Sequence, residues 1–296
     1  MAMQLMTWNT QWCCGLDGEV DPARIVQVIQ EMGGCDVLCL QEIAVNYPQL
    51  QGSPQNQVEQ LQALLPGWQL FFGAAVDEFS SQGRQQFGNL IATRLPVLQV
   101  QHYPLPYPAD MDVRSMPRMC TVVTVQDPEL GAVRVMTTHL EYYSKRQRMA
   151  QAHALRRLNF EALSQVYAPG EQVHDGSPFQ SKVHTPHAVL CGDFNLEATE
   201  HEYGVLASDA SVIECLEAGW PEQVVGSSWS DAWRVLHPQQ AQPHTFKVFD
   251  RRYGPEPVAC DFVWVSDSLR SHVRSFTVNG DTKVSDHQPV RVVLGG

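Results

Sequence analysis

The chain has 296 residues, an apolar share of 44% and a formal net charge of −12, with 20 basic residues against 32 acidic ones. This length and composition allow a large core, and no apolar run approaches the roughly 18–20 residues needed to cross a membrane. Sequence-independent binding to duplex nucleic acid depends on clustered lysines and arginines, so binding of long duplexes is expected to be weak.

Two features of the sequence indicate the cellular compartment of the protein: its first residues and its cysteine usage. The chain begins without a basic stretch followed by a long apolar one, which predicts no secretory leader and a cytoplasmic protein. Its eight cysteines are dilute over this length, and several lie within apolar runs: Cys39, Cys120, Cys191 and Cys260. We therefore expect buried free thiols rather than a disulfide framework. No cysteine or histidine pairs have the spacing of a structural zinc site.

The first part of the chain alternates predicted strands with helices. Leu5–Trp8 and Val37–Leu40 are short apolar runs that favour buried strands. Between them, Asp21-Pro22 is typical of a helix N-cap with proline at the first helical position. The apolar positions of this helix are Ile25, Val26, Ile29 and Met32. Those of a second helix, which ends at Pro66-Gly67, are Val58, Leu61, Leu64 and Leu65.

The rest of the chain is rich in predicted strands and contains one long predicted helix. Ser144–Gln147 matches a capping box, and the helix that follows has its apolar face at Met149, Ala152, Leu155, Leu158, Ala162 and Val166. Residues 168–187 are rich in Gly, Pro and Ser and are predicted to form a surface loop. Predicted strands precede and follow these segments: Asn89–Thr93, Val97–Tyr103, Met119–Val125, Val133–Thr138, Ala188–Cys191, Asp261–Val265, Val273–Val278 and Pro289–Leu294.

Four short polar clusters lie where predicted strands meet loops. They are Asn9 with Gln41-Glu42, then Thr138-His139, then Gly192-Asp193-Phe194-Asn195, and finally Ser285-Asp286-His287. Carboxylates, carboxamides and imidazoles are the side chains that hold a hard divalent cation and move protons at a phosphate. The clusters therefore indicate metal-assisted phosphate chemistry.

These clusters, in this order, resemble the motifs of the endonuclease/exonuclease/phosphatase superfamily, the metal-dependent phosphoesterases related to deoxyribonuclease I. The resemblance runs from Thr7-Trp8-Asn9 to Ser285-Asp286-His287 and implies one catalytic domain over residues 1–296. It implies an α/β four-layer sandwich in which two packed mixed β-sheets are flanked by helices. Helix and strand patterns that mix without strict alternation fit this architecture.

The resemblance assigns the metal to Glu42, which follows Leu38-Cys39-Leu40-Gln41 as the family's metal-binding glutamate follows a strand. Asn9 and Asp286 are expected beside it. The implied ion is Mg²⁺, with Mn²⁺ as its substitute. Because Mg²⁺ keeps several waters and needs few carboxylates, this set is chemically sufficient.

Asp193 and Asn195 are two residues apart, so in an extended segment both side chains point to one face. An Asx turn beside a helix cap is the alternative reading of Gly-Asp-X-Asn. The resemblance implies that Asp193 positions or deprotonates the attacking water and that Asn195 holds a phosphate oxygen.

Asp261 and His287 are expected to pair, because a carboxylate on one ring nitrogen fixes the tautomer of histidine and raises its basicity. The resemblance leaves open whether Asp193 or His287 is the general base. It implies that His139 stabilises the phosphorane or protonates the leaving oxygen. Arg118 corresponds to a phosphate-contacting arginine, with a surface salt bridge as the alternative.

The predicted function is Mg²⁺-dependent hydrolysis of a phosphodiester, in nucleic acid or in a lipid or small-molecule headgroup, by in-line attack of activated water. One alternative is an inositol-phosphate phosphomonoesterase, because Pro257–Asp261 resembles the Cys-Asp-Arg motif of that group. Phe262, however, stands in place of its arginine. The other alternative is an inactive sandwich that serves as a scaffold, although every central position is filled. The oligomeric state is left open.

Overall fold

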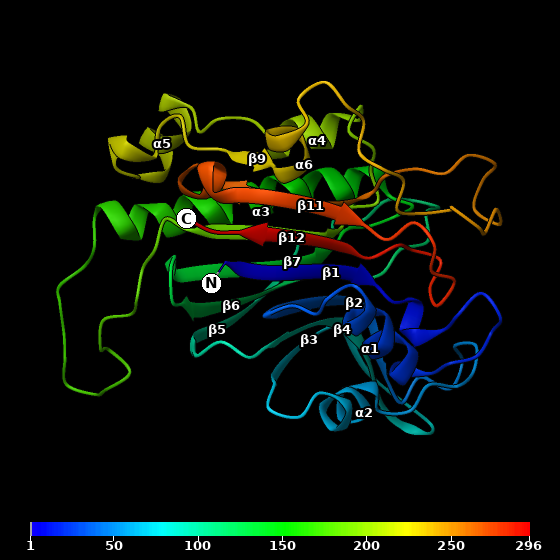
Figure 1. Ribbon diagram of the computed structural model, residues 1–296. Helices are drawn as coiled ribbons and strands as arrows, with labels where there is room; N and C mark the ends of the chain where they lie inside the picture. Colours follow the sequence, from blue (N-terminus) through cyan, green and yellow to red (C-terminus); the bar gives the residue numbers. More distant parts are fainter. Residues whose placement is uncertain (1) are drawn as a thin grey trace.

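Two six-stranded β-sheets form the centre of the fold in the computed structural model, which describes residues 2–296 (Figure 1). The first sheet contains, in spatial order, β11 (Val273–Val278), β12 (Val290–Leu294), β1 (Met3–Asn9), β2 (Val37–Val45), β4 (Gly83–Thr93) and β3 (Gln69–Ser80). The second contains β5 (Val97–Pro104), β6 (Met119–Asp127), β7 (Gly131–His139), β8 (Ala188–Asp193), β10 (Asp261–Ser266) and β9 (Trp229–Asp231).

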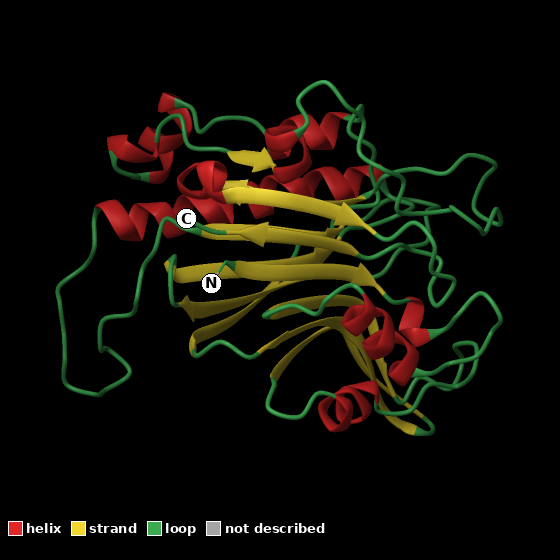
Figure 2. Cartoon of the chain, in the orientation of Figure 1, coloured by secondary structure: helices red, strands yellow, loops and turns green. Residues whose placement is uncertain are grey.

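Helices cover the outer faces of both sheets (Figure 2). On the first sheet lie α1 (Pro22–Glu31) and α2 (Gln57–Leu64). On the second lie α3 (Lys145–Tyr167) and α4 (His201–Leu206), and α5 (Val212–Ala218) packs against α3. The short helix α6 (Ala232–Leu236) lies at the edge of the sandwich, where it contacts β9 and β10 of the second sheet and β11 of the first. Three short 3₁₀ helices complete the elements: η1 (Gln11–Cys13), η2 (Glu222–Val224) and η3 (Asp267–His272). The predicted four-layer α/β sandwich is confirmed.

The central strands are buried on both faces because each sheet has an apolar layer on either side. Between the sheets, Leu5 and Val37 of the first pack in one cluster with Val135 and Val189 of the second. The alternate residues of the same strands face the helices, as Leu190 does in the cluster that includes Leu155 of α3. Central strands therefore appear in the sequence as continuous apolar runs rather than as alternating patterns.

The caps and buried faces that the sequence predicts for the helices are confirmed in part. The Asp21 side chain caps α1 by accepting a bond from Ala23 N at 2.8 Å, with Pro22 at the first helical position. At α3, Ser144 Oγ accepts from Gln147 N at 3.1 Å, but the Gln147 side chain donates to Pro108 O instead of completing a capping box. Leu64, predicted on the buried face of α2, is exposed.

Several elements carry no clear pattern in the sequence. The strand β3 lies at a sheet edge, where most of its side chains are partly or fully exposed, so an apolar run is not required. The elements β9, α4, α5 and α6 are too short to show a periodic pattern of apolar residues. Residues 168–187 form the predicted irregular segment.

The register of two parallel strand pairs brings the polar clusters together. In the first sheet β1 and β2 are parallel, and Asn9 lies opposite Gln41. In the second sheet β7 and β8 are parallel, and His139 lies opposite Asp193. The antiparallel β10 places Asp261 opposite Asp193 from the other side. Parallel strands end at one edge of a sheet, so this register predicts one common site.

Gln41 joins the two sheets just below that edge. Its Nε2 donates to Thr7 Oγ1 at 3.1 Å in the first sheet and to Thr137 Oγ1 at 2.9 Å in the second. All three side chains are fully buried. Hydrogen bonds in such an environment fix the relative position of the sheets, because breaking them would leave buried polar groups unsatisfied.

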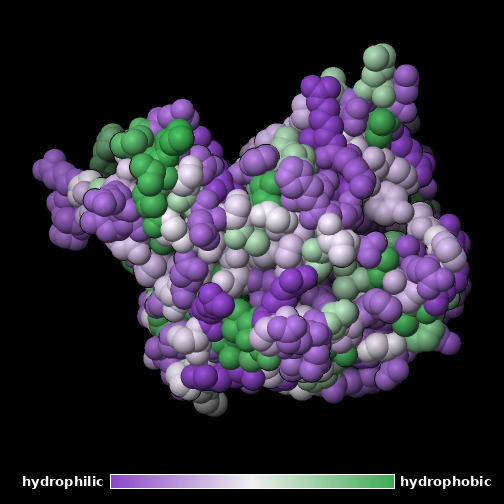
Figure 3. Space-filling model, turned by 90° about the horizontal axis from the view of Figure 1, so that it is seen from above, coloured by the Kyte–Doolittle hydropathy of each residue, from purple (hydrophilic) through white to green (hydrophobic). Residues whose placement is uncertain are grey.

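All eight cysteines are free and buried. No helix within residues 2–296 is both apolar and long enough to traverse a membrane. The face formed by the short helices of the second sheet is mostly hydrophilic, with a hydrophobic group at the end where α5 lies (Figure 3). On α5 itself the exposed apolar residues are Val212, Ile213 and Leu216.

Gly192 should be essential to the strand pairing that presents Asp193. Its φ is +140°, and a Cβ there would lie 1.9 Å from Thr138 O of the neighbouring strand. We expect Gly192→Ala to lower the free energy of unfolding, measured by urea denaturation, by about 2–4 kcal/mol.

Gly204→Ala is the matched control. Gly204 lies exposed in α4, and an added Cβ there would meet no atom within 4 Å. Alanine should leave the protein as stable as before or stabilise it by up to about 1 kcal/mol. Equal effects at the two glycines would contradict the steric explanation.

Candidate active site

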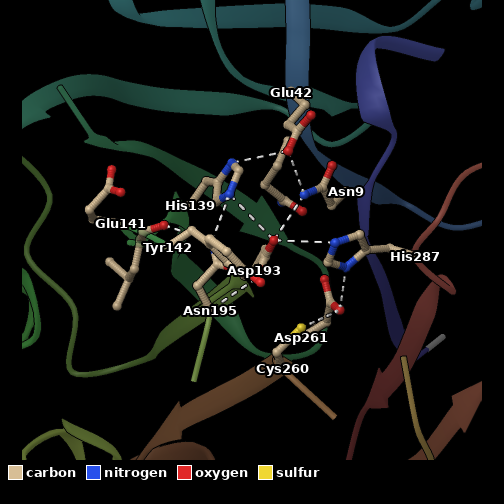
Figure 4. Close-up of polar contacts among 12 residues, drawn as sticks. Asn9, Glu42, His139, Glu141, Tyr142, Asp193, Asn195, Cys260, Asp261 and His287 are labelled. Atoms are coloured by element: carbon tan, nitrogen blue, oxygen red, sulfur yellow. Dashed lines mark hydrogen bonds and ion pairs between the residues drawn. The ribbon is translucent and has the colours of Figure 1, made fainter. Parts of the chain in front are cut away.

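The carboxylate of Asp193 is the centre of the polar clusters (Figure 4). Its Oδ2 accepts a hydrogen bond from Asn9 Nδ2 at 2.9 Å. The same oxygen lies 3.4 Å from His139 Nε2 and 3.5 Å from His287 Nε2. Asp193 is 1% exposed. A buried carboxylate requires donors of this kind, because an unpaired charge in the interior is very costly.

Glu42 lies beside this centre in an unusual backbone conformation. It is part of β2 rather than the residue after the strand, which continues to Val45 through a bulge between Leu40 and Ile43. Its φ is +60°, a left-handed value uncommon for a residue with a side chain. Asn9 Nδ2 donates to Glu42 Oε1 at 3.1 Å, and the side chain stays 19% exposed.

Asn195 departs from the extended geometry that its spacing predicted. The strand β8 ends at Asp193, and Asn195 has φ +51°. Asn195 N donates to Asp193 Oδ1 at 2.9 Å, which forms the Asx turn that was the alternative. The turn nevertheless serves the site, because Asn195 Nδ2 lies 3.0 Å from His139 Nε2 and also donates to Leu140 O.

The expected pair of Asp261 and His287 is present. His287 Nδ1 lies 2.9 Å from Asp261 Oδ2, and the ring stacks on Phe246 with centroids 4.4 Å apart. Asp261 is the first residue of β10. Ser285 Oγ accepts from His287 N and donates to Asn9 O, which ties the last cluster to the first. These contacts leave His287 little freedom to reorient.

Arg118 does not form the surface salt bridge that was its alternative. Its Nε donates to Glu141 Oε2 at 3.1 Å, and the two side chains are 6% and 1% exposed. Glu141 Oε1 also accepts from Tyr143 N. Nη1 of Arg118 is buried and has no hydrogen-bond partner within residues 2–296. A buried guanidinium donor without a partner can bind an anionic oxygen.

The two histidines on Asp193 differ in charge. Burial and the charge of Arg118 lower the pKa of His139 to about 3. Burial also acts to lower the pKa of His287, but Asp261 and Asp193 outweigh it and raise that pKa to about 10. For Asp193, burial acts to raise the pKa, but His287, His139 and the hydrogen bonds from Asn9 and Asn195 together outweigh it, so the net shift is downward. The metal-free site thus holds a neutral ring on one side of Asp193 and a charged one on the other.

The donor set at Glu42 fits a hard divalent cation. Burial and the nearby Asp286 carboxylate raise the pKa of Glu42 to about 7. Burial raises the pKa of Asp286 as well. Among the described residues, neither carboxylate forms a salt bridge with lysine or arginine. Two adjacent, unneutralised carboxylates that face a cavity are suitable ligands for Mg²⁺ or Mn²⁺.

A cavity of about 230 Å³ opens over these groups. Glu42, His139, Asp193, Asp286 and His287 line its floor. Its rim is mainly aromatic and includes Trp12, Phe87, Tyr142, Tyr143, Phe246 and Tyr253. Tyr142 and Tyr143 come from one segment of the chain and Phe246 and Tyr253 from another, so two distant segments meet at the mouth of the cavity.

A second cavity of about 350 Å³ adjoins the first and shares Tyr142, Asn195 and Phe246 with it. Lys145 and Lys247 lie in its wall. Lys145 pairs with Glu200 at 2.8 Å. No salt bridge involves Lys247 anywhere in residues 2–296; its Nζ lies 5.9 Å from the Phe246 ring centre. The two cavities together are large enough for a substrate that extends to both sides of the reacting group.

Glu141 and Ser285 had no role in the site that the sequence predicted. The position of Glu141, two residues after His139, was the only signal for it. Ser285 belonged to a noted cluster without a role. The stacking of Phe246 on His287 could not be predicted, because it joins residues 41 apart in the sequence.

The comparisons with protein families and with solved structures agree with each other. The sequence profile of the Endonuclease/Exonuclease/phosphatase family matches residues 6–287. None of the curated proteins compared with the chain matches its sequence. Among solved structures, an endonuclease/exonuclease/phosphatase from Beutenbergia cavernae is similar, with 26% identity, a TM-score of 0.61, and 100% of this chain and 72% of that chain covered.

Two other solved structures share the fold at lower identity. A mannosyl-6-phosphatase from Bacteroides thetaiotaomicron has 18% identity and a TM-score of 0.63, with 99% of each chain covered. The human Nocturnin catalytic domain has 20% identity and a TM-score of 0.60, with 99% of this chain and 92% of that chain covered.

The opposite pKa shifts of the two histidines can be tested in protein kept metal-free with chelator. His139 should stay neutral until the pH falls toward about 3, and His287 should stay protonated until it rises toward about 10. Between pH 5 and 8, where an unperturbed histidine changes charge, ¹⁵N chemical shifts of both rings should be constant. A midpoint near 6.5 for either ring would contradict the electrostatics described above.

Proposed function

Because the chain belongs to the endonuclease/exonuclease/phosphatase family, we propose that it is a metal-dependent phosphodiesterase that hydrolyses its substrate by attack of an activated water. The observation that carries this proposal is the convergence of Asn9, His139 and His287 on the Asp193 carboxylate, beside Glu42. One buried carboxylate, two imidazoles and a separate acidic ligand suffice for this chemistry.

Glu42 and Asp286 would hold the ion, with Asn9 alongside. Asn9 donates its amide to both Glu42 and Asp193, so it holds the metal-binding carboxylate and the water-orienting carboxylate at a fixed separation. A bound Mg²⁺ would supply Lewis-acid polarisation of a phosphoryl oxygen. Mn²⁺ has similar ligand preferences and should substitute.

Asp193, His287 and Asp261 would orient the water and take up its proton. Asp193 Oδ2 and His287 Nε2 lie 3.5 Å apart, and Asp261 fixes the opposite ring nitrogen. Groups that interact this strongly titrate as one unit, so the proton belongs to the set rather than to either residue. The alignment needed for in-line attack comes from positions fixed before substrate binds.

Asn195, His139 and Arg118 would stabilise the charge that develops on the phosphoryl group. Asn195 Nδ2 and His139 Nε2 are 3.0 Å apart at the cavity floor, and Nη1 of Arg118 is an unused donor in the same cavity wall. Donors that are fixed in place and shielded from water stabilise such charge strongly. All three reach the cavity from the second sheet or its connecting loops.

The two adjoining cavities favour a diester over a monoester. A monoester has one organic group and would fill one cavity, whereas a diester has groups on both sides of phosphorus. The aromatic rim offers stacking surfaces for a planar group, and Lys247 offers a positive charge on the other side. A phosphatase is among the proteins that share this fold, so both classes of substrate need testing.

Activity should depend on the metal. Chelator should abolish hydrolysis of bis(p-nitrophenyl) phosphate, and Mg²⁺ or Mn²⁺ should restore it, while the monoester p-nitrophenyl phosphate should react more slowly. Glu42→Gln should raise the half-saturating Mg²⁺ concentration on the order of tenfold or more, since even outer-shell changes at metal sites have effects of that size. Glu217→Gln, at an exposed position of α5, is the control. Full activity in excess chelator would disprove the mechanism.

The water-activating set should behave as a unit. Asp193→Asn and His287→Ala should each lower kcat by about 10²–10⁴-fold, and the double variant should be little worse than the poorer single one. Asp281→Asn, an exposed change outside the site, should have no effect. The thermal unfolding of each variant is also measured. If a variant loses activity only because less of it is folded, the residue has a structural role instead.

A further inference from the structure

A third kind of ligand lies in the wall of the candidate active site. Cys260 is 3% exposed, and its Sγ, an Asp193 oxygen and a His287 ring nitrogen all lie within 4.8 Å of one another. The thiol lines the larger cavity, while Asp193 and His287 line the smaller one. The three groups therefore stand where the two cavities adjoin, and an ion can reach them from either side.

The spacing of these atoms is close to that around tetrahedral zinc. Bonds of about 2.0–2.3 Å at the tetrahedral angle place neighbouring ligand atoms roughly 3.3–3.8 Å apart. Asp193 Oδ2 and His287 Nε2 are already 3.5 Å apart. The Cys260 thiol lies within 4.8 Å of a ligand atom of each residue, and it would have to turn toward them from Asp261 Oδ2, to which it donates at 3.6 Å.

The surroundings also match a zinc site. Zinc-binding histidines commonly donate their other ring nitrogen to a carboxylate, and Asp261 occupies that position on His287 at 2.9 Å. When Cys260 and His287 each give up a proton to solvent, the thiolate and the Asp193 carboxylate neutralise the two charges of Zn²⁺. Three protein ligands would leave a fourth position for water or phosphate.

This set differs in chemistry from the ligands at Glu42. Glu42 and Asp286 offer oxygen only, which suits Mg²⁺, whereas a thiolate and an imidazole favour Zn²⁺ and Cd²⁺. The two sets share no ligand, but zinc bound to Asp193 and His287 would occupy the atoms that the proposed reaction needs. Zinc at this site would therefore stop the reaction while Mg²⁺ remains bound at Glu42 and Asp286.

We propose that Asp193, Cys260 and His287 form an inhibitory site for a thiophilic divalent cation, with Zn²⁺ as its natural occupant. The binding of zinc follows from the geometry alone, whereas the inhibition rests on the proposed function. Cys260 takes no part in the proposed hydrolysis, so its thiol makes the site responsive to zinc rather than to magnesium.

The first experiment measures inhibition. With saturating Mg²⁺, ZnCl₂ should inhibit diester hydrolysis, and Cys260→Ser should raise the half-inhibitory concentration by about tenfold or more, each variant being normalised to its own zinc-free rate. Cys215→Ser removes another buried cysteine, in α5, and should leave inhibition as it is in the wild type. Equal sensitivity of the two variants would overturn the proposal.

The second experiment observes binding directly in the wild-type protein, whether or not it is active. Zinc-edge absorption spectra at one equivalent of Zn²⁺ should show one sulfur at about 2.3 Å with nitrogen and oxygen at about 2.0–2.2 Å. Cd²⁺ should give a thiolate charge-transfer band that Cys215→Ser retains and Cys260→Ser loses. A coordination shell without sulfur would overturn the site. Sulfur ligation without inhibition would instead refute the inhibitory role and the placement of Asp193 and His287 in the reaction.

Discussion

The burial of the Asp193 carboxylate is the constraint on which the rest of the site depends. A charge with 1% exposure is tolerated only when donors surround it. Its three partners come from β1, from the end of β7 and from the segment before β12, so both sheets must be complete and correctly placed before the charge is satisfied. The bonds from Gln41 to Thr7 and Thr137 hold the sheets in that position.

The backbone at the site is held in conformations that the chain would not adopt by itself. Glu42 and Asn195 both have positive φ, and each presents its side chain to the cavity from that position. Such conformations persist only where the surroundings impose them. The hydrogen bond from Arg118 to Glu141 fixes the guanidinium as well, so the remaining donor Nη1 is in position before any ligand binds. A preorganised site of this type needs little rearrangement during reaction.

The central strands, the long helix α3 and the chemistry-bearing clusters could be predicted from the sequence, because continuous apolar runs and the polar residues that end them are local signals. The edge strand β3 could not, since an exposed edge does not demand apolar residues. Asn195 was placed on an extended segment because the spacing rule ignores the turn that Asp193 itself induces. The stacking of Phe246 on His287 and the ion pair of Arg118 with Glu141 depend on tertiary packing, which no local pattern encodes.

The strand order of the two sheets has a consequence for how the protein is made. Matched in space, β11, β12, β1, β2, β4 and β3 correspond to β5, β6, β7, β8, β10 and β9, with the same parallel and antiparallel pairings throughout. The second sheet is one uninterrupted stretch of chain, but the first is closed by pairing Met3 with Leu294, near the two ends. On the ribosome, all strands of the second sheet emerge while β1 to β4 still lack their last two partners. Because domains fold as their segments emerge, the half that carries Asp193 can form early, and His287 joins it only after all strands of that half have been made. The candidate active site therefore stays incomplete until the segment that precedes β12 has emerged.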